Sequence, residues 1–247
     1  MSAPRLLMLH GWTMRGAAFG PLIDRLEGID CLAPDLPGHG VPGAGLDDCV
    51  ALIEEQSRGR DIVLLGWSMG AAVAWRYIRE FGAGRLAGLI TVDMAPKLCV
   101  TPDWPHGLIG QDAARLAATT AEIHTDWPAA AQKIATTMFA SRDGSPQMMR
   151  AAALRQVLDN DPSIMARYWD EMVAMDLRDV MPAISCPTLV AHGGQSRVYP
   201  GSGADWLAGA IPGAERVCFK ASGHSPHLEE PERFAEVVRA FWTRCTG

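Results

Sequence analysis

The sequence predicts an α/β protein with a mostly parallel sheet flanked by helices, and two features of the chain support this prediction. In the first third, short apolar runs that end at Gly, Pro or Asp alternate with stretches of helical composition. Short runs of this kind are typical of strands that are buried on both faces of a parallel sheet. The same alternation resumes after residue 183, so both ends of the chain are expected to contribute to one sheet.

The middle of the chain differs from its two ends in composition and in the secondary structure that it predicts. Residues 97–182 are rich in Ala and Met and contain no convincing strand. We therefore expect a core formed by residues 1–96 and 183–247, with a helical lid over 97–182. The lid is inserted after the expected strand 86–92, which follows the expected helix 70–81. The expected strands are 5–9, 29–33, 61–65, 86–92, 188–192 and 216–220. The expected helices are 70–81 and 231–242 in the core, with 111–124, 128–139, 145–158 and 162–174 in the lid.

Composition narrows the classes of protein that fit. The chain has 247 residues, 48% of them hydrophobic, with a net charge of −6, which suits one globular domain. It has no basic run, so nucleic acid is not an expected partner. No apolar run approaches the ~18 residues that a membrane span needs, and no leader pattern is visible. Six scattered cysteines fit a reducing compartment. We expect a cytoplasmic protein.

The segment with the clearest chemical signal joins the third expected strand to the helix that follows it. Its sequence is Gly66-Trp67-Ser68-Met69-Gly70. A G-x-S-x-G motif between strand and helix holds its serine on a strained turn, and small residues are needed on both sides. The turn exposes the hydroxyl at the carboxyl end of the sheet, with a helix N-terminus behind it. Ser68 is therefore the expected nucleophile.

A serine hydroxyl needs a general base, and His224 is the expected one. It follows the last expected strand and precedes the last helix, so its loop also lies at the carboxyl end of the sheet, where ligands bind in open α/β sheets. His227 is the competing candidate. Because His224 comes directly after a glycine at the end of the strand, we favour it and expect His227 to pack or to form structural hydrogen bonds.

The loop after the first strand supplies a second element of the expected site. In a site of this kind, backbone N–H groups from this loop and from the residue after the nucleophile hold the negatively charged oxygen of the transition state. These donors would belong to Trp12 and Met69. Gly11 allows the main chain to approach the substrate, and His10 is expected to brace the loop.

Taken together, these residues resemble the α/β-hydrolase superfamily over essentially the whole chain. Within it, the chain is most similar to small capped esterases, including the pimeloyl-carrier methyl-ester esterases of biotin synthesis and the cofactor-free haloperoxidase/perhydrolase-like esterases. The segments that carry the resemblance are LHGWT (9–13), APDLPGHG (33–40), GWSMGA (66–71), MDLRDVMPAISCPTLVAHG (175–193) and SGHSPHLEEPERF (222–234).

The resemblance leaves the acid of the triad unplaced. Members of the superfamily usually carry it after the penultimate strand, but Ser196 stands there, and no carboxylate lies between His192 and Asp205. Asp205 is expected in the next helix, too far along to reach His224. Some haloalkane dehalogenases place their acid at the end of the strand after the nucleophile helix, where this chain has Asp93. We expect Asp93 to be the acid; otherwise it braces the lid hinge, and Ser196 or a water holds the histidine.

Aromatic side chains near the site are candidates for the pocket wall. They are Trp67 beside the nucleophile, and Trp104, Phe139 and Trp169 in the expected lid. The alternative for each is packing in the core, which is the commoner fate of aromatic residues at helical spacing. An apolar wall would suit an acyl or aromatic ester of modest size.

The expected activity is hydrolysis of a carboxylic ester, with neither cofactor nor metal. Ser68 would attack the carbonyl, His224 would take its proton, and Trp12 and Met69 would hold the oxyanion. The substrate would be a small-molecule ester, or an acyl ester linked to a carrier protein. Alternatives on the same triad are C–C bond hydrolysis, lactone hydrolysis and perhydrolysis. A non-catalytic ligand-binding homologue is the alternative outside the enzymes.

Overall fold

The structure is a computed structural model that describes residues 4–247. Residues 1–3 lie outside the described residues. They belong to the expected core range 1–96 and to the terminus that is expected to lack a leader. A six-stranded sheet with the order β2-β1-β3-β4-β5-β6 forms the centre, and its neighbouring strands pair in parallel. The strands are β1 (Arg5–Leu9), β2 (Cys31–Leu32), β3 (Ile62–Trp67), β4 (Leu86–Val92), β5 (Thr188–Gly193) and β6 (Glu215–Phe219).

Both faces of the sheet are buried, because successive strand residues point to opposite sides. In β1, Leu6 and Met8 belong to one hydrophobic cluster, and Leu7 and Leu9 belong to the other. The four central strands are therefore continuous apolar runs. This agrees with the sequence-based prediction of a parallel sheet between two helical layers.

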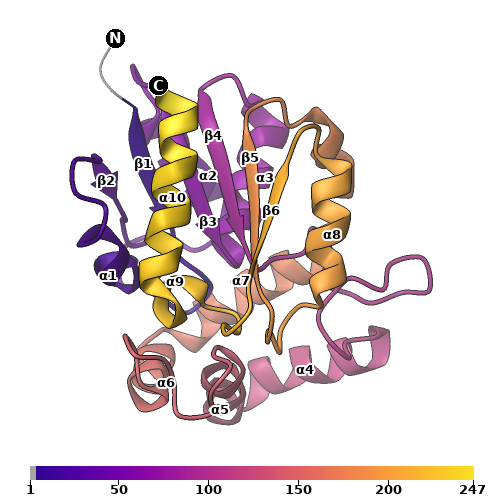
Figure 1. Cartoon of the computed structure of the whole chain (residues 1–247). Helices are drawn as coiled ribbons and strands as arrows, with labels where there is room; N and C mark the ends of the chain where they lie inside the picture. Colours follow the sequence, from indigo (N-terminus) through magenta and orange to yellow (C-terminus); the bar gives the residue numbers. More distant parts are fainter. Residues whose placement is uncertain (1–3) are drawn as a thin grey trace.

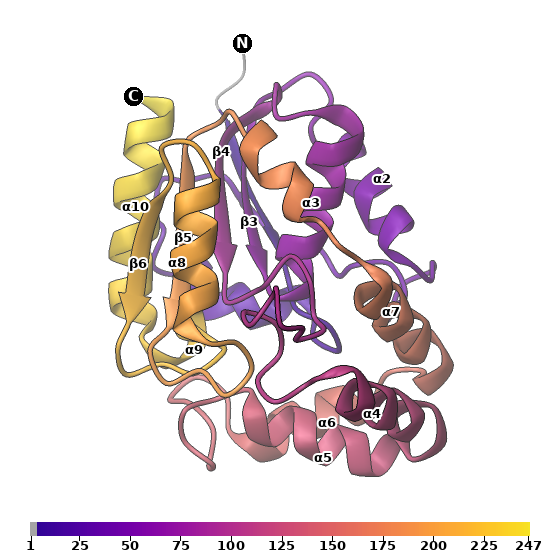
Figure 2. The ribbon, with the colours of Figure 1, turned by 90° about the vertical axis from the view of Figure 1, so that its right-hand side faces the viewer.

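Helices cover the two faces, and Figures 1 and 2 show the sheet between them. One face packs against α2 (Leu46–Gln56), α3 (Met69–Phe81) and α8 (Gly201–Ala210), and the other packs against α1 (Gly20–Ile23) and α10 (Pro231–Thr246). Three short elements complete the core: η1 (Gly16–Phe19), η2 (Arg178–Ala183) and α9 (Pro226–Glu229).

The second expected strand is shorter than predicted. Residues 29–33 were expected to be extended, but β2 contains only Cys31 and Leu32. It lies at the edge of the sheet and pairs with β1 alone, through Leu6 and Leu7. A strand with one neighbour has fewer hydrogen bonds to hold it extended, and Pro34 follows directly.

Four helices lie between β4 and β5 in the chain. They are α4 (Ala113–Thr125), α5 (Trp127–Thr137), α6 (Arg150–Leu158) and α7 (Pro162–Ala174). Figures 1 and 2 show them gathered at the end of the sheet toward which the strands point. Aspartate side chains at Asp112, Asp126 and Asp161 accept hydrogen bonds from the first turns of α4, α5 and α7. These caps explain why the helices begin where they do.

Helix α6 begins later than the sequence predicts. The expected helix covered 145–158, whereas the structure has a turn before Arg150. The Ser145 hydroxyl oxygen accepts the N–H of Met148 at 3.0 Å, and Ser145 N–H donates to the Met148 carbonyl at 2.9 Å. A serine that bonds to nearby backbone in this way competes with helix formation.

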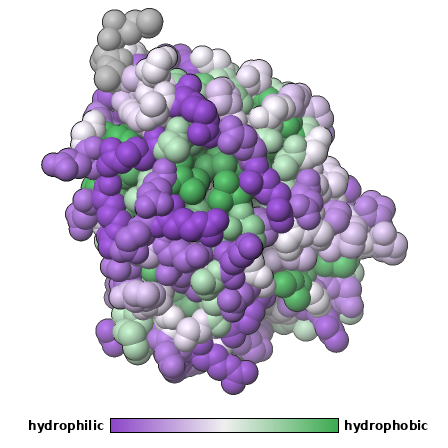
Figure 3. Space-filling model, in the orientation of Figure 1, coloured by the Kyte–Doolittle hydropathy of each residue, from purple (hydrophilic) through white to green (hydrophobic). Residues whose placement is uncertain are grey.

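One face of the molecule carries α10. Figure 3 shows the face over α10, where hydrophilic side chains predominate and hydrophobic ones form smaller areas. Among residues 4–247, no helix has the length and apolar character that crossing a membrane would require.

Candidate active site

Ser68 lies on a sharp turn between β3 and α3. Its φ of 52° and ψ of −121° are unfavourable for a residue with a side chain. The flanking glycines are required by space. A Cβ on Gly66 would lie 2.5 Å from the Ala71 nitrogen, and one on Gly70 would lie 2.2 Å from the Leu9 carbonyl oxygen. The spacing of the motif is therefore dictated by close contacts between main-chain segments.

His224 lies in the loop after β6, and its ring contacts Asp93 at the end of β4. The distance from Nδ1 to Asp93 Oδ2 is 2.7 Å, and the side chains are only 9% and 1% exposed. The Trp67 indole N–H donates to the His224 carbonyl at 2.8 Å and so fixes the loop against β3. Because Nδ1 is engaged by Asp93, the Nε2 nitrogen is left for the cavity that Ser68 and His224 both line.

Asp93 forms hydrogen bonds with β5 and with the loop that follows it. Its N–H continues the pairing of β4 with β5 by donating to Ala191 O at 2.9 Å. Its Oδ1 accepts the N–H of Gly193 at 3.1 Å, and its Oδ2 accepts the Ser196 hydroxyl at 2.7 Å. The histidine thus contacts the carboxylate of Asp93, and Ser196 contacts that carboxylate in turn.

The other carboxylate considered from the sequence is engaged elsewhere. Asp205 lies within α8, as expected, where its Oδ1 pairs with Arg216 Nε at 2.8 Å. Its side chain is 63% exposed, and it is absent from the polar contacts of His224.

His227 is a packing residue. Its ring is fully buried and lies 4.5 Å from the Trp67 ring and 4.9 Å from the Phe19 ring, between centroids. Within residues 4–247, neither ring nitrogen has a hydrogen-bond partner. Burial, with a smaller effect of nearby His224, lowers the pKa of His227 to about 3, so the ring is neutral at physiological pH.

The loop after β1 runs beside the nucleophile. A Cβ on Gly11 would lie 3.3 Å from Ser68 Cβ, so the loop packs directly on the turn. Across residues 4–247, no acceptor is paired with the backbone N–H of Trp12 or of Met69. Met69 is the first residue of α3, whose initial N–H groups have no partner inside the helix. Two free donors therefore flank Ser68.

His10 braces this loop from beneath, as the sequence predicted. Its Nδ1 donates to Gly11 O at 2.9 Å, and its Nε2 accepts the N–H of Leu36 at 2.9 Å. Burial, together with neighbouring His39, holds the pKa of His10 well below its usual value. A neutral ring with one donor and one acceptor fits this arrangement.

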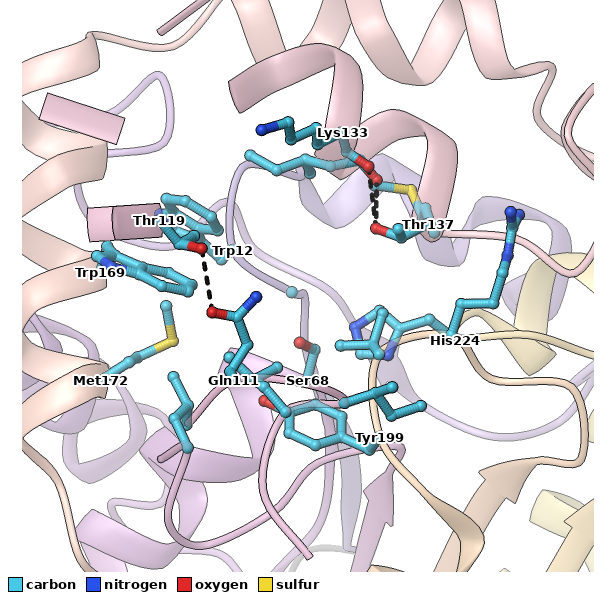
Figure 4. A pocket seen from close by; sticks show the side chains of 18 of the residues that line it. Trp12, Ser68, Gln111, Thr119, Lys133, Thr137, Trp169, Met172, Tyr199 and His224 are labelled. Atoms are coloured by element: carbon cyan, nitrogen blue, oxygen red, sulfur yellow. Dashed lines mark hydrogen bonds between the residues drawn. The ribbon is translucent and has the colours of Figure 1, made fainter. Parts of the chain in front are cut away.

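A cavity of about 370 Å³ opens at Ser68 and His224. This volume suits a small organic ligand. Trp67 and Trp169 line it, as expected from the sequence, and Trp12 stacks on Trp169 at 5.3 Å between ring centroids. Figure 4 shows the rings of Trp12 and Trp169 opposite His224, with Ser68 between the two sides.

The sequence did not identify several residues of the wall. Figure 4 shows Gln111 and Tyr199 near Ser68, with Gln111 accepting a 3.0 Å hydrogen bond from the hydroxyl of Thr119. Tyr199 packs 5.9 Å from the His224 ring and donates its hydroxyl to Met94 Sδ. The aromatic character of Tyr199, three residues after Ser196, was an available signal.

Trp104 and Phe139, two of the four expected wall residues, lie outside the cavity. Trp104 packs edge-on against Trp206 at 4.8 Å, and its indole N–H donates to the Lys97 carbonyl at 3.0 Å. Phe139 is fully buried in the hydrophobic cluster that includes α10. Both rings therefore serve packing.

The chain is similar to known proteins over most of its length. The alpha/beta hydrolase family matches residues 6–237 of the chain. The chain belongs to this family. The α/β hydrolase is 29% identical over 250 residues to the pimeloyl-[acyl-carrier protein] methyl ester esterase of Vibrio vulnificus (strain YJ016), covering 96% of this chain and 94% of that protein. It is 27% identical to the enzyme of the same name from Nitrosomonas europaea, with 97% and 96% covered.

The fold is shared with a solved esterase from Exiguobacterium antarcticum. The TM-score is 0.86 at 23% sequence identity, over 98% of this chain and 93% of that structure. At this identity the similarity establishes the fold. Among residues 4–247, no group of three or more His, Cys, Asp or Glu side chains could hold a metal ion.

Proposed function

We propose that this α/β hydrolase cleaves a carboxylic ester through an acyl-enzyme on Ser68, with His224 as general base and Asp93 as the acid of the triad. The chain belongs to the alpha/beta hydrolase family, and its curated relatives are named as methyl ester esterases. The observation that carries the assignment of residues is the 2.7 Å contact between His224 Nδ1 and Asp93 Oδ2, beside the turn that exposes Ser68.

The first half of the proposed reaction forms the acyl-enzyme. Ser68 Oγ attacks the ester carbonyl carbon while its proton passes to His224 Nε2. The carbonyl oxygen becomes negatively charged and accepts hydrogen bonds from the N–H groups of Trp12 and Met69. The C–O bond to the alcohol then breaks, and the alcohol leaves with the proton from His224.

The second half returns the enzyme to its starting state. Water attacks the acyl carbon and gives a proton to His224, and the same two N–H groups hold the oxyanion. The bond to Ser68 Oγ breaks, the carboxylic acid is released, and Ser68 regains its proton. Asp93 stabilises the imidazolium in both halves, which a neutral partner would not do.

The proposed substrate is a small ester whose acyl or alcohol part fits an apolar wall. We propose that residues 97–182 act as a lid over a core formed by 1–96 and 183–247, because the cavity is lined from both. Lys133 lines the cavity yet its side chain is 69% exposed, so the cavity reaches the surface near α5. A long acyl chain could therefore extend outward, as a carrier-linked ester of the kind that the relatives' names describe would require.

The test uses a serine-reactive fluorophosphonate probe with wild type and Ser68→Ala. We expect covalent labelling of Ser68 and rapid release of p-nitrophenol from short acyl esters, with both lost in the variant. A folded wild type that is not labelled and releases no p-nitrophenol would overturn the proposal in favour of a ligand-binding homologue.

The substrate is tested separately with a panel of methyl esters of increasing chain length, free and carrier-linked. We expect kcat/KM to rise where the acyl chain contacts the Trp12 and Trp169 wall. Higher kcat/KM on lactones, on C–C substrates or in perhydrolysis would keep the triad and replace the ester as the preferred substrate.

A further inference from the structure

The carboxylate that contacts His224 has a second close partner on the loop after β5. The Ser196 hydroxyl donates to Asp93 Oδ2 at 2.7 Å, the same oxygen that accepts the hydrogen bond from His224 Nδ1. We propose that Ser196 is a positioning residue of the triad, whose hydroxyl orients the Asp93 carboxylate for His224. The inference rests on the function proposed above and concerns the same site.

The direction of the Ser196 hydrogen bond is set by its other partners. The hydroxyl oxygen accepts the N–H groups of Val198 and Tyr199, each at 3.2 Å. A hydroxyl has one proton and two acceptor sites. Because both acceptor sites are used by the loop itself, the single proton is directed to Asp93.

The other carboxylate oxygen of Asp93 is held by the end of β5, directly before this loop. Oδ1 accepts the N–H of Gly193 at 3.1 Å, so the β5 end supplies one donor to each oxygen of Asp93. The Asp93 side chain is 1% exposed and its φ is 48°, a main-chain conformation that L-residues rarely adopt. Surrounding contacts therefore hold the side chain in place, and the Ser196 bond is the one closest to the imidazole.

Ser196 acts through Asp93 and not on the substrate. Neither residue is among those that line the cavity at Ser68. His192 on β5 and Tyr199 on the same loop interact electrostatically with Asp93, His227 and Glu229 on α9 interact with His224, and Arg197 follows Ser196 in the chain. Of these, Arg197 donates to the carbonyl oxygens of Thr136 and Phe139, and Glu229 accepts backbone N–H groups.

The first test removes the hydroxyl with Ser196→Ala and measures kcat and KM separately on a p-nitrophenyl ester. A hydrogen bond to a charged group is worth enough that its loss lowers kcat by about tenfold or more. KM should stay within about twofold, because Ser196 does not touch substrate. Ser196→Thr keeps the hydroxyl and should restore most of kcat.

A matched control removes a buried hydroxyl at the start of β5, the strand that precedes the Ser196 loop. Thr188 donates to the Cys186 carbonyl at 3.0 Å, and Thr188→Val is close in shape. We expect kcat to be unchanged in this variant. If Ser196→Ala lowers only thermal stability and leaves kcat at the wild-type value, the proposed positioning role is wrong.

The second test moves the acid. Because Ser196 Oγ lies 2.7 Å from the oxygen that contacts His224, a carboxylate at position 196 should reach the same imidazole. The kcat of the Asp93→Asn, Ser196→Asp double variant should be at least about tenfold higher than that of Asp93→Asn. A folded double variant that is no more active than Asp93→Asn contradicts the inference. Labelling of wild-type Ser68 by fluorophosphonate separates this failure from failure of the proposed function.

Discussion

The loops that follow β4 and β5 reach the same point of the sheet edge but supply different groups. The first places Asp93 against His224 at 2.7 Å, and the second places Ser196 against Asp93 at the same distance. The pattern of the superfamily would put the acid in the second loop, where this chain has a hydroxyl. Because β4 and β5 are paired neighbours, the ends of both strands lie close to the same carboxylate.

The proposed acid is therefore assigned from its contact with the histidine and not from its place in the chain. Asp93 and His224 are 131 residues apart, and Ser196 is 103 residues from Asp93. The main chain of Asp93 takes a strained conformation that tilts its side chain toward the histidine loop, while Gly193 and Ser196 hold the carboxylate.

The largest effect should come from removing the charge of the first loop. Asp93→Asn keeps the shape but leaves the imidazolium without its carboxylate, and the equivalent change in a serine protease lowers kcat by about 10⁴. We expect a fall of that order in p-nitrophenyl ester turnover, with circular dichroism unchanged. Turnover within threefold of wild type would show that Asp93 is not the acid.

A smaller effect should follow from a substitution at the end of β5, where the second loop begins. Gly193 at the end of β5 has no room for a side chain, since a Cβ there would lie 1.7 Å from the Gly223 carbonyl oxygen. Gly193→Ala should lower the free energy of unfolding by about 1–3 kcal/mol and should reduce kcat. The matched change Gly209→Ala, on α8 with open space around it, should leave kcat unchanged and should not lower the free energy of unfolding in urea.

A third prediction concerns the pH dependence of the free energy of unfolding. In the folded protein burial lowers the pKa of His227 to about 3, below its value of about 6.5 when unfolded. The unfolded state therefore binds more protons between these values, so stability falls as pH drops below about 6.5. His227→Phe should reduce that slope by about one proton in unfolding experiments at several pH values. An unchanged slope would contradict a neutral, buried His227.

The smallest effect on turnover is expected at Asp205, the next carboxylate in the chain after the second loop. Asp205→Asn removes a partly exposed ion pair with Arg216, and such pairs contribute at most about 1 kcal/mol. Turnover should equal that of wild type, and the melting temperature should change little. A large loss of kcat would mean that α8 supplies the acid, which would reverse the comparison of the two loops.

The sequence by itself determined the parts of the site that depend on local geometry. The glycines around Ser68 are needed because neighbouring main-chain segments approach within van der Waals contact, and such a need is visible as a motif. The strands showed as apolar runs because both faces of the sheet are covered. His224 could be chosen over His227 from its place after the last strand.

Tertiary structure decided the contacts between segments that are distant in the chain. Trp12 and Tyr199 became wall residues while Trp104 and Phe139 became packing residues, because an aromatic ring fits either role and only its neighbours select one. The contact of Asp93 with His224 was a hypothesis from strand order, and its geometry depends on the pairing of β4 with β5. That pairing also brought Ser196 to Asp93, a contact that spacing along the chain could not specify.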